Sequence, residues 1–110
     1  MTEAPKDLSP AQVAELLRDG AQAVDVRERY EREAGHIADT VHIELDELSA
    51  RADAIERERP VVFYCRSGSR SALAAQAFAA AGFEAHNLDG GLKAWVEDGL
   101  PIEPADGHVA

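Results

Sequence analysis

Short apolar runs with β propensity alternate with helical segments along this chain, and this alternation limits the fold more than any other feature. The clearest unit begins with Val61-Val62-Phe63-Tyr64, an apolar run typical of a buried strand. A short loop follows and leads into an alanine-rich segment, residues 71–81, for which we predict a helix that ends at Gly82. Strands that alternate with helices favour an α/β domain with a mainly parallel central sheet and helices on both faces.

The other segments continue the alternation. Ser9, Pro10 and Gln12 form a helix start, with a capping serine, a proline at the first helical position and a capping-box glutamine. We predict strands over 21–26, 40–43 and 85–88 and a turn or short helix over the charged run 28–33. Apolar residues at helical spacing predict an amphipathic helix over 45–58, and a final helix is predicted over 92–98.

Length and composition indicate one domain. The 110 residues match the usual size of a single domain, which we place over 1–110 with its core at about 8–101 and a loose polar tail at 103–110. No apolar stretch reaches the length of a membrane span, and the first residues lack the features of a secretory signal. The single cysteine excludes an internal disulfide, so a cytoplasmic location is expected.

Charge is distributed unevenly. The net charge of −10 disfavours nucleic acid and anionic membrane as partners. Residues 60–83 contain two arginines and no Asp or Glu, although an even spread of the 21 acidic residues would place about five there. This distribution predicts a locally cationic site on an otherwise acidic chain.

The cationic stretch contains Cys65, which follows the strand at 61–64 and therefore lies at the sheet edge where α/β proteins bind ligands. A helix N-terminus and arginine side chains both favour thiolate over thiol, so Cys65 is the predicted nucleophile. Glycine in the loop permits a tight bend, and serine hydroxyls and inward-facing amides hold an anion. The residues predicted to bind the substrate are those that follow the cysteine: Arg66, Ser67, Gly68, Ser69 and Arg70.

Three segments carry a family resemblance. Residues 65–71, Cys-Arg-Ser-Gly-Ser-Arg-Ser, resemble the active-site loop of single-domain rhodaneses, the thiosulfate sulfurtransferases. Residues 25–28 with 35–37, Asp-Val-Arg-Glu and Gly-His-Ile, resemble the first signature of that family, and residues 88–95 resemble its C-terminal signature. The resemblance extends over about residues 8–101 and implies a rhodanese-like domain.

The resemblance also implies a mechanism without a cofactor or metal. Cys65 attacks the outer sulfur of a small anionic donor such as thiosulfate, and the resulting persulfide passes its sulfur to cyanide, a thiol or a protein acceptor. In this family the aspartate at position 25 supports the site, so we expect Asp25 to contact the loop, with Arg70 as a candidate partner, or else to cap a turn. Arg27 either adds to the cationic field or pairs with a neighbouring carboxylate.

Loop length separates sulfur transfer from related chemistry. The spacing here is Cys-x4-Arg, whereas related phosphatases and arsenate reductases use Cys-x5-Arg and need arginine where this chain has Ser71. The shorter loop favours a bound sulfur, and a rhodanese-like module that carries sulfur or binds a partner with little thiosulfate activity is the alternative. His36 is expected to make a structural hydrogen bond, and Gly90-Gly91 to form either a plain turn or an anion nest.

Overall fold

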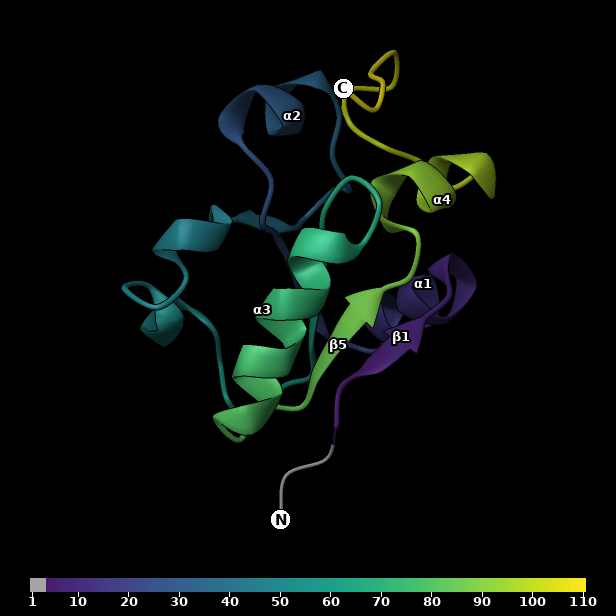
Figure 1. Ribbon diagram of the computed structural model, residues 1–110. Helices are drawn as coiled ribbons and strands as arrows, with labels where there is room; N and C mark the ends of the chain where they lie inside the picture. Colours follow the sequence, from purple (N-terminus) through teal and green to yellow (C-terminus); the bar gives the residue numbers. More distant parts are fainter. Residues whose placement is uncertain (1–3) are drawn as a thin grey trace.

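The computed structural model describes residues 4–110 and has a five-stranded sheet in the order β1-β5-β4-β2-β3. All four strand pairs are parallel, which confirms the α/β prediction. The strands are β1 (Lys6–Leu8), β2 (Gln22–Asp25), β3 (Val41–His42), β4 (Val61–Tyr64) and β5 (Ala85–Leu88). The helices are α1 (Pro10–Arg18), α2 (Arg29–Ala34), α3 (Ser69–Ala80) and α4 (Gly91–Glu97). Figure 1 shows α3 lying along one face of the sheet, with α2 near its upper edge.

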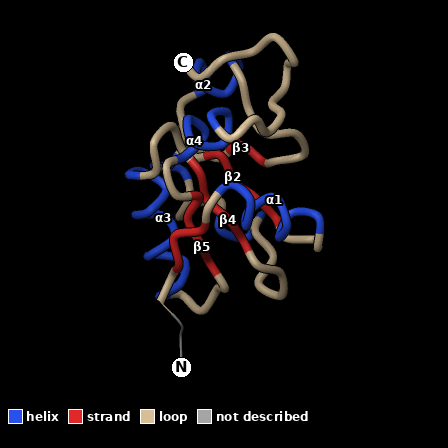
Figure 2. Tube along the Cα trace, turned by 90° about the vertical axis from the view of Figure 1, so that its right-hand side faces the viewer, coloured by secondary structure: helices blue, strands red, loops and turns tan. Residues whose placement is uncertain are grey.

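Helices cover both faces of the sheet because alternate residues of β4 point to opposite sides. Val61, Phe63 and Cys65 join the core cluster beneath α3, whereas Val62 and Tyr64 join a second cluster with residues of α1 and α4. Figure 2 shows α3 on one side of the strands and α1 on the other. All four residues of β4 are buried, as expected of a central strand.

The position of β4 places Cys65 at the middle of one sheet edge. β4 lies between β2 and β5, and all three strands run in the same direction. Their carboxyl ends therefore lie side by side, with Asp25 ending β2 and Leu88 ending β5 on either side of the loop that begins at Cys65. Ligands of open α/β sheets bind at such an edge.

The predicted helix over 45–58 is wrong. This segment instead forms two single 3₁₀ turns, η1 (Leu45–Glu47) and η2 (Ala52–Ala54). Leu48 and Ile55 are nevertheless buried in the cluster beneath α3, so the apolar spacing does report which residues face the core. Two short turns bury the same apolar residues as a continuous helix would, so the apolar spacing alone does not distinguish the two structures. Here packing of the segment against the sheet decides in favour of the turns.

Both ends of the chain also differ from the expectations. β1 is not predicted, because Lys6 and Asp7 are exposed and an edge strand held by backbone pairing with β5 needs no apolar alternation. The tail at 103–110 makes contacts that its polar sequence does not predict: Glu103 exchanges two backbone hydrogen bonds with His36, at 2.9 and 2.7 Å, and the amide of His108 donates to the carbonyl oxygen of Ala34 at 2.9 Å. Within residues 4–110, no helix is both long and apolar enough to cross a membrane.

Candidate active site

The loop after β4 bends back over the sulfur of Cys65. Gly68 adopts a left-handed conformation with φ +107°, as the sequence predicts for a tight bend at this glycine. Its amide donates a hydrogen bond of 3.1 Å to Cys65 Sγ. The helix α3 begins at the next residue, Ser69, two residues earlier than predicted. The first turn of a helix has free amide groups, and here the loop aims some of them at the sulfur.

The environment of Cys65 favours its thiolate. Burial raises the pKa of the thiol, but hydrogen bonds from the Ser71 hydroxyl and from the amides of Ser71, Gly68 and Ser67 outweigh burial and lower that pKa. Arg70 adds a further electrostatic attraction to the sulfur. Cys65 is completely buried, so its sulfur is shielded from water in this structure.

The N-terminus of α4 binds the backbone carbonyl groups at the start of the loop. The amides of Leu92 and Lys93 donate to the carbonyl oxygens of Cys65 and Arg66, at 2.8 and 3.1 Å. Gly91 has φ +64°, and a Cβ there would lie 2.5 Å from the backbone carbonyl carbon of Arg66. Only glycine permits this approach, so Gly91 is part of a structural turn whose following amides bind the loop. Holding the loop carbonyls outward leaves the opposite side for inward-facing amides.

Arg70 is paired with a carboxylate that the sequence analysis does not single out. Its guanidinium donates two hydrogen bonds to Glu31 of α2, at 2.8 and 2.9 Å, and the Glu31 side chain is 3% exposed. These bonds lower the pKa of Glu31 although burial opposes the change, and they raise the pKa of Arg70. The expected contact between Asp25 and Arg70 is therefore wrong, and the positive charge of Arg70 is largely neutralised.

Asp25 instead belongs to a buried ion-pair network. Its carboxylate accepts hydrogen bonds from Arg27 Nε and one terminal nitrogen at 2.9 and 2.8 Å, and Arg32 lies 3.6 Å away. Asp25 Oδ1 also accepts from the backbone amide of Arg27 at 3.0 Å, which confirms the other expectation, that Asp25 caps a turn. The same terminal nitrogen of Arg27 donates to the carbonyl oxygen of Gly35 at 2.7 Å. Of the two roles considered for Arg27, the structure has the pairing with a carboxylate. This network fixes the two ends of α2, the helix that carries Glu31.

The remaining loop side chains face away from the sulfur or into solvent. Arg66 is exposed, and its Nε donates to the backbone oxygen of Ala110 at 2.9 Å. The side chains of Ser67 and Ser69 are exposed as well. Ser67 therefore approaches Cys65 through its amide rather than through its hydroxyl.

Two polar residues beneath the loop are missed by the sequence analysis as site residues. Ser71 Oγ lies 3.3 Å from Cys65 Sγ and 2.6 Å from Asn87 Oδ1. Both side chains are buried. Asn87 could be identified from the sequence as a polar residue within the short predicted strand 85–88, because a buried polar side chain needs a hydrogen-bond partner. Ser71 could be identified because it stands where the Cys-x5-Arg spacing of phosphatases has its arginine.

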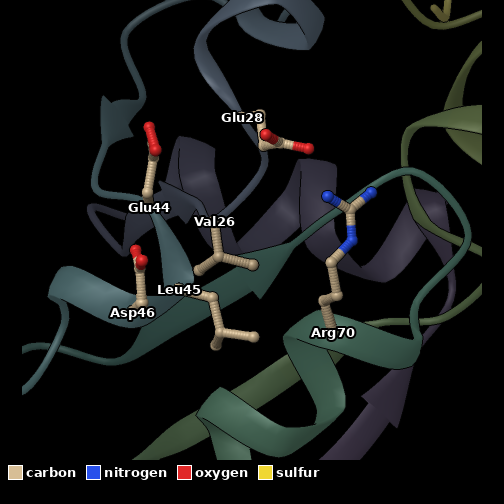
Figure 3. A pocket seen from close by; sticks show the side chains of 6 residues that line it. All are labelled: Val26, Glu28, Glu44, Leu45, Asp46 and Arg70. Carbon is tan, nitrogen blue, oxygen red and sulfur yellow. The ribbon is translucent and has the colours of Figure 1, made fainter.

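An open cavity of about 280 Å³ lies beside Arg70. Figure 3 shows the Arg70 side chain pointing toward Glu28, with the apolar side chains of Val26 and Leu45 to one side. The residues that line the cavity are Val26, Glu28, Glu44, Leu45, Asp46 and Arg70. Three of the four charged side chains in this lining are acidic, so the cavity is not the cationic site that the sequence predicts.

The histidines near this edge make structural contacts. His36 Nδ1 lies 3.1 Å from the carbonyl oxygen of Arg32, which confirms the expected structural hydrogen bond. His42 Nε2 lies 2.7 Å from the carbonyl oxygen of Arg27. Among residues 4–110, His, Cys, Asp and Glu side chains do not gather in groups of three or more that suit a metal ion.

Comparisons with known proteins agree with this geometry. The family model described as "Rhodanese-like domain" matches residues 9–98. The thiosulfate sulfurtransferase GlpE of Pseudomonas aeruginosa is 33% identical over 107 residues, which cover 96% of this chain and 94% of that protein. GlpE of Actinobacillus pleuropneumoniae serotype 7 is 32% identical and covers 96% and 99%. A solved structure of a rhodanese-related protein from Thermoplasma volcanium has a TM-score of 0.83 at 29% identity and covers 88% and 96%.

Proposed function

Because this chain belongs to the rhodanese-like domain family, we propose that it moves sulfane sulfur from thiosulfate or a similar donor to a thiophilic acceptor through a persulfide on Cys65. The observation that carries the proposal is the buried sulfur of Cys65, surrounded by amide and hydroxyl donors that lower its pKa. A thiolate is the nucleophilic form of cysteine, so this setting suits attack on a donor sulfur.

The proposed reaction has two displacements. The Cys65 thiolate attacks the outer sulfur of thiosulfate, a new S–S bond forms, and the old S–S bond breaks with its electron pair leaving on sulfite. The acceptor then attacks the outer sulfur of the persulfide, and Cys65 leaves as a thiolate. The charge on sulfur stays close to the amides of Ser67, Gly68 and Ser71 throughout, which stabilise it without a cofactor or metal.

The proposed partners are a small anionic sulfur donor and a thiol or protein acceptor, and the proposed compartment is the cytoplasm. A sulfur-carrier or partner-binding module with little thiosulfate activity is the alternative. One observation favours the alternative: the cavity beside Arg70 is lined by Glu28, Glu44 and Asp46, which disfavour a small anionic donor. Phosphatase chemistry is disfavoured, because Ser71 occupies the position of the phosphate-binding arginine.

The test is turnover of thiosulfate with cyanide as acceptor. The wild-type protein should produce thiocyanate, and Cys65→Ser should lower the rate by at least about a thousandfold because it removes the nucleophile. Equal rates for the two proteins would contradict the proposal. Mass spectrometry after thiosulfate treatment separates the alternative, since added sulfur on Cys65 without thiocyanate production indicates a carrier. Aryl phosphate hydrolysis, expected to be absent, tests the phosphatase reading.

A further inference from the structure

The hydroxyl of Ser71 faces more acceptors than it has protons. Its oxygen lies 2.6 Å from Asn87 Oδ1, 3.3 Å from Cys65 Sγ and 3.3 Å from the carbonyl oxygen of Gly68. A serine hydroxyl carries one proton and donates one hydrogen bond along its O–H direction. A hydrogen bond to the sulfur and one to Asn87 are therefore alternatives, and Asn87 is the nearer acceptor.

The side-chain amide of Asn87 is held in one orientation. Its Nδ2 lies 3.0 Å from Asp7 Oδ1 and 3.2 Å from the carbonyl oxygen of Gly68. Both neighbours are acceptors, so the NH2 group must face them and Oδ1 must face Ser71. A flipped amide would place its oxygen against two acceptors in a buried setting, which is costly. Asn87 consequently offers Ser71 an acceptor and not a donor.

We propose that Asn87 is a positioning residue for the proposed sulfur transfer. Its Oδ1 competes with Cys65 Sγ for the hydrogen bond that the Ser71 hydroxyl donates. When Cys65 is a thiolate, the Ser71 hydroxyl rotates toward the sulfur and Asn87 Oδ1 loses its donor. When the sulfur is a thiol or the inner sulfur of a persulfide, the hydroxyl returns to Asn87. The O–H bond of Ser71 stays intact, and ionisation of the thiol releases its proton to solvent.

The persulfide state makes this exchange useful. A persulfide carries its negative charge on the outer sulfur, and the inner sulfur is then a weak acceptor like that of a thioether. Asn87 Oδ1 gives the Ser71 hydroxyl a partner during that half of the cycle, so the buried hydroxyl is paired in both halves. The cost falls on the thiolate state, in which Asn87 Oδ1 is left without this donor.

Two substitutions should therefore move the ionisation of Cys65 in opposite directions. Ser71→Ala removes the hydroxyl donor and should raise the pKa of the thiol by about one pH unit, an approximately tenfold change in ionisation. Asn87→Leu removes the nearest competing acceptor at similar size, which leaves the hydroxyl with Cys65 Sγ and the carbonyl oxygen of Gly68. The charged thiolate is the stronger of these two acceptors, so the pKa of the thiol should fall by about half a pH unit. Ser49→Ala, at an exposed serine outside the loop, is the control and should match the wild type.

The measurement is ultraviolet absorbance of the Cys65 thiolate against pH, checked by the rate of alkylation. A shift of both variants in the same direction, or an unchanged midpoint for Asn87→Leu, would overturn the proposal. If Asn87→Leu does not fold, Asn87→Ala carries the same expectation, with circular dichroism as the check on folding. The titration uses no sulfur donor, so its outcome does not depend on the proposed function, whose failure would appear as missing persulfide in mass spectrometry.

Discussion

The two sides of the Cys65 loop handle charge in different ways. On the inner side, the sulfur is completely buried and receives hydrogen bonds from neutral groups, the backbone amides and the hydroxyl of Ser71. On the outer side, Arg70 is bound to Glu31, and three further carboxylates line the adjoining cavity. The inner side favours an anion through oriented dipoles, while the outer side presents net negative charge.

This difference separates stabilisation of the reactive sulfur from attraction of the donor. Oriented amides act over a few ångströms and need no free cation, so the sulfur remains activated while Arg70 is neutralised. The proposed dianionic donor, in contrast, would pass Glu28, Glu44 and Asp46 if it entered by the cavity beside Arg70, on a chain of net charge −10. We therefore expect changes on the inner side to act on the chemistry, and changes on the outer side to act on donor affinity.

The largest effect is expected where the inner side depends on a close backbone approach. Gly91→Ala would place a Cβ 2.5 Å from the carbonyl carbon of Arg66 at a left-handed φ of +64°. The loop must shift, so its backbone amides no longer point at Cys65 Sγ. Thiosulfate turnover should fall at least about a hundredfold, and the free energy of unfolding by about 2 kcal/mol. Steady-state kinetics and urea denaturation measure the two quantities.

Gly99→Ala is the matched control for Gly91→Ala. Gly99 also has a left-handed φ, +79°, but a Cβ there meets nothing within 4 Å. This variant should lose about 1 kcal/mol of stability through backbone strain and keep its turnover. If both variants lost turnover equally, strain in general would explain the result and the specific support of the loop by Gly91 would be refuted.

A smaller effect is expected from releasing Arg70 on the outer side. Glu31→Gln removes the carboxylate charge but keeps a similar shape and a hydrogen-bonding oxygen. The guanidinium then carries a net charge beside the site, so the KM for thiosulfate should fall about threefold to tenfold with little change in kcat. Adding Arg70→Ala to the Glu31→Gln variant should raise the KM for thiosulfate again. A higher KM in Glu31→Gln would indicate that the pair positions Arg70 for binding instead of neutralising it.

The pH dependence of the Glu31–Arg70 pair keeps this test separate from the titration of Cys65. Hydrogen bonds from Arg70 lower the pKa of Glu31 from its ordinary value of 4.5, so the pair contributes stability above about pH 4.5 and loses it as pH falls through the folded-state pKa. Arg70 stays protonated, since its pKa is raised. At neutral and alkaline pH the pair is intact, and the pH profile of donor use should follow Cys65.

Ionic strength provides a test without mutation. Salt screens exposed charges over about 8–10 Å at 0.1–0.15 M. If repulsion by the acidic outer side dominates, kcat/KM for thiosulfate should rise about twofold to threefold between low salt and 0.15 M. The kcat/KM for an uncharged thiol acceptor, measured at saturating donor, should not change with salt concentration. A fall with salt would mean that the arginines, not the carboxylates, dominate the approach of the donor.

The sequence predicts the inner side well because its determinants are local. A strand, a cysteine, a glycine and a helix start follow one another within residues 61–80, and parallel topology places such a loop at the sheet edge. Residues this close in sequence remain neighbours in the fold, so the proposed nucleophile and the bend that follows it can be inferred from the sequence. Ser71 is part of the same local run, but its contact with Asn87 depends on the pairing of β4 with β5.

The outer side is not predictable in the same way, because its charges come from distant segments. Residues 60–83 contain no Asp or Glu, which suggests a cationic site, yet Glu31 lies 39 residues from Arg70 and pairs with it in the fold. Glu44 and Asp46 reach the cavity because residues 45–58 wrap around the sheet as turns instead of forming the predicted helix. Charge counted along a sequence is therefore a poor guide to charge around a site.

The smallest effect is expected for the second arginine of the loop. Arg66 is exposed, and its Nε points to the backbone oxygen of Ala110 rather than to the sulfur. Arg66→Ala should change kcat/KM for thiosulfate by less than about twofold, since an exposed charge is well screened. Lys93→Ala, at an exposed lysine whose amide holds the loop, is the comparison for loss of one charge. A tenfold loss of kcat/KM in Arg66→Ala but not in Lys93→Ala would indicate that the Arg66 side chain binds the donor. The division between an amide-lined inner side and an acidic outer side would then be incomplete, because donor binding would depend on a cationic contact that the structure does not show.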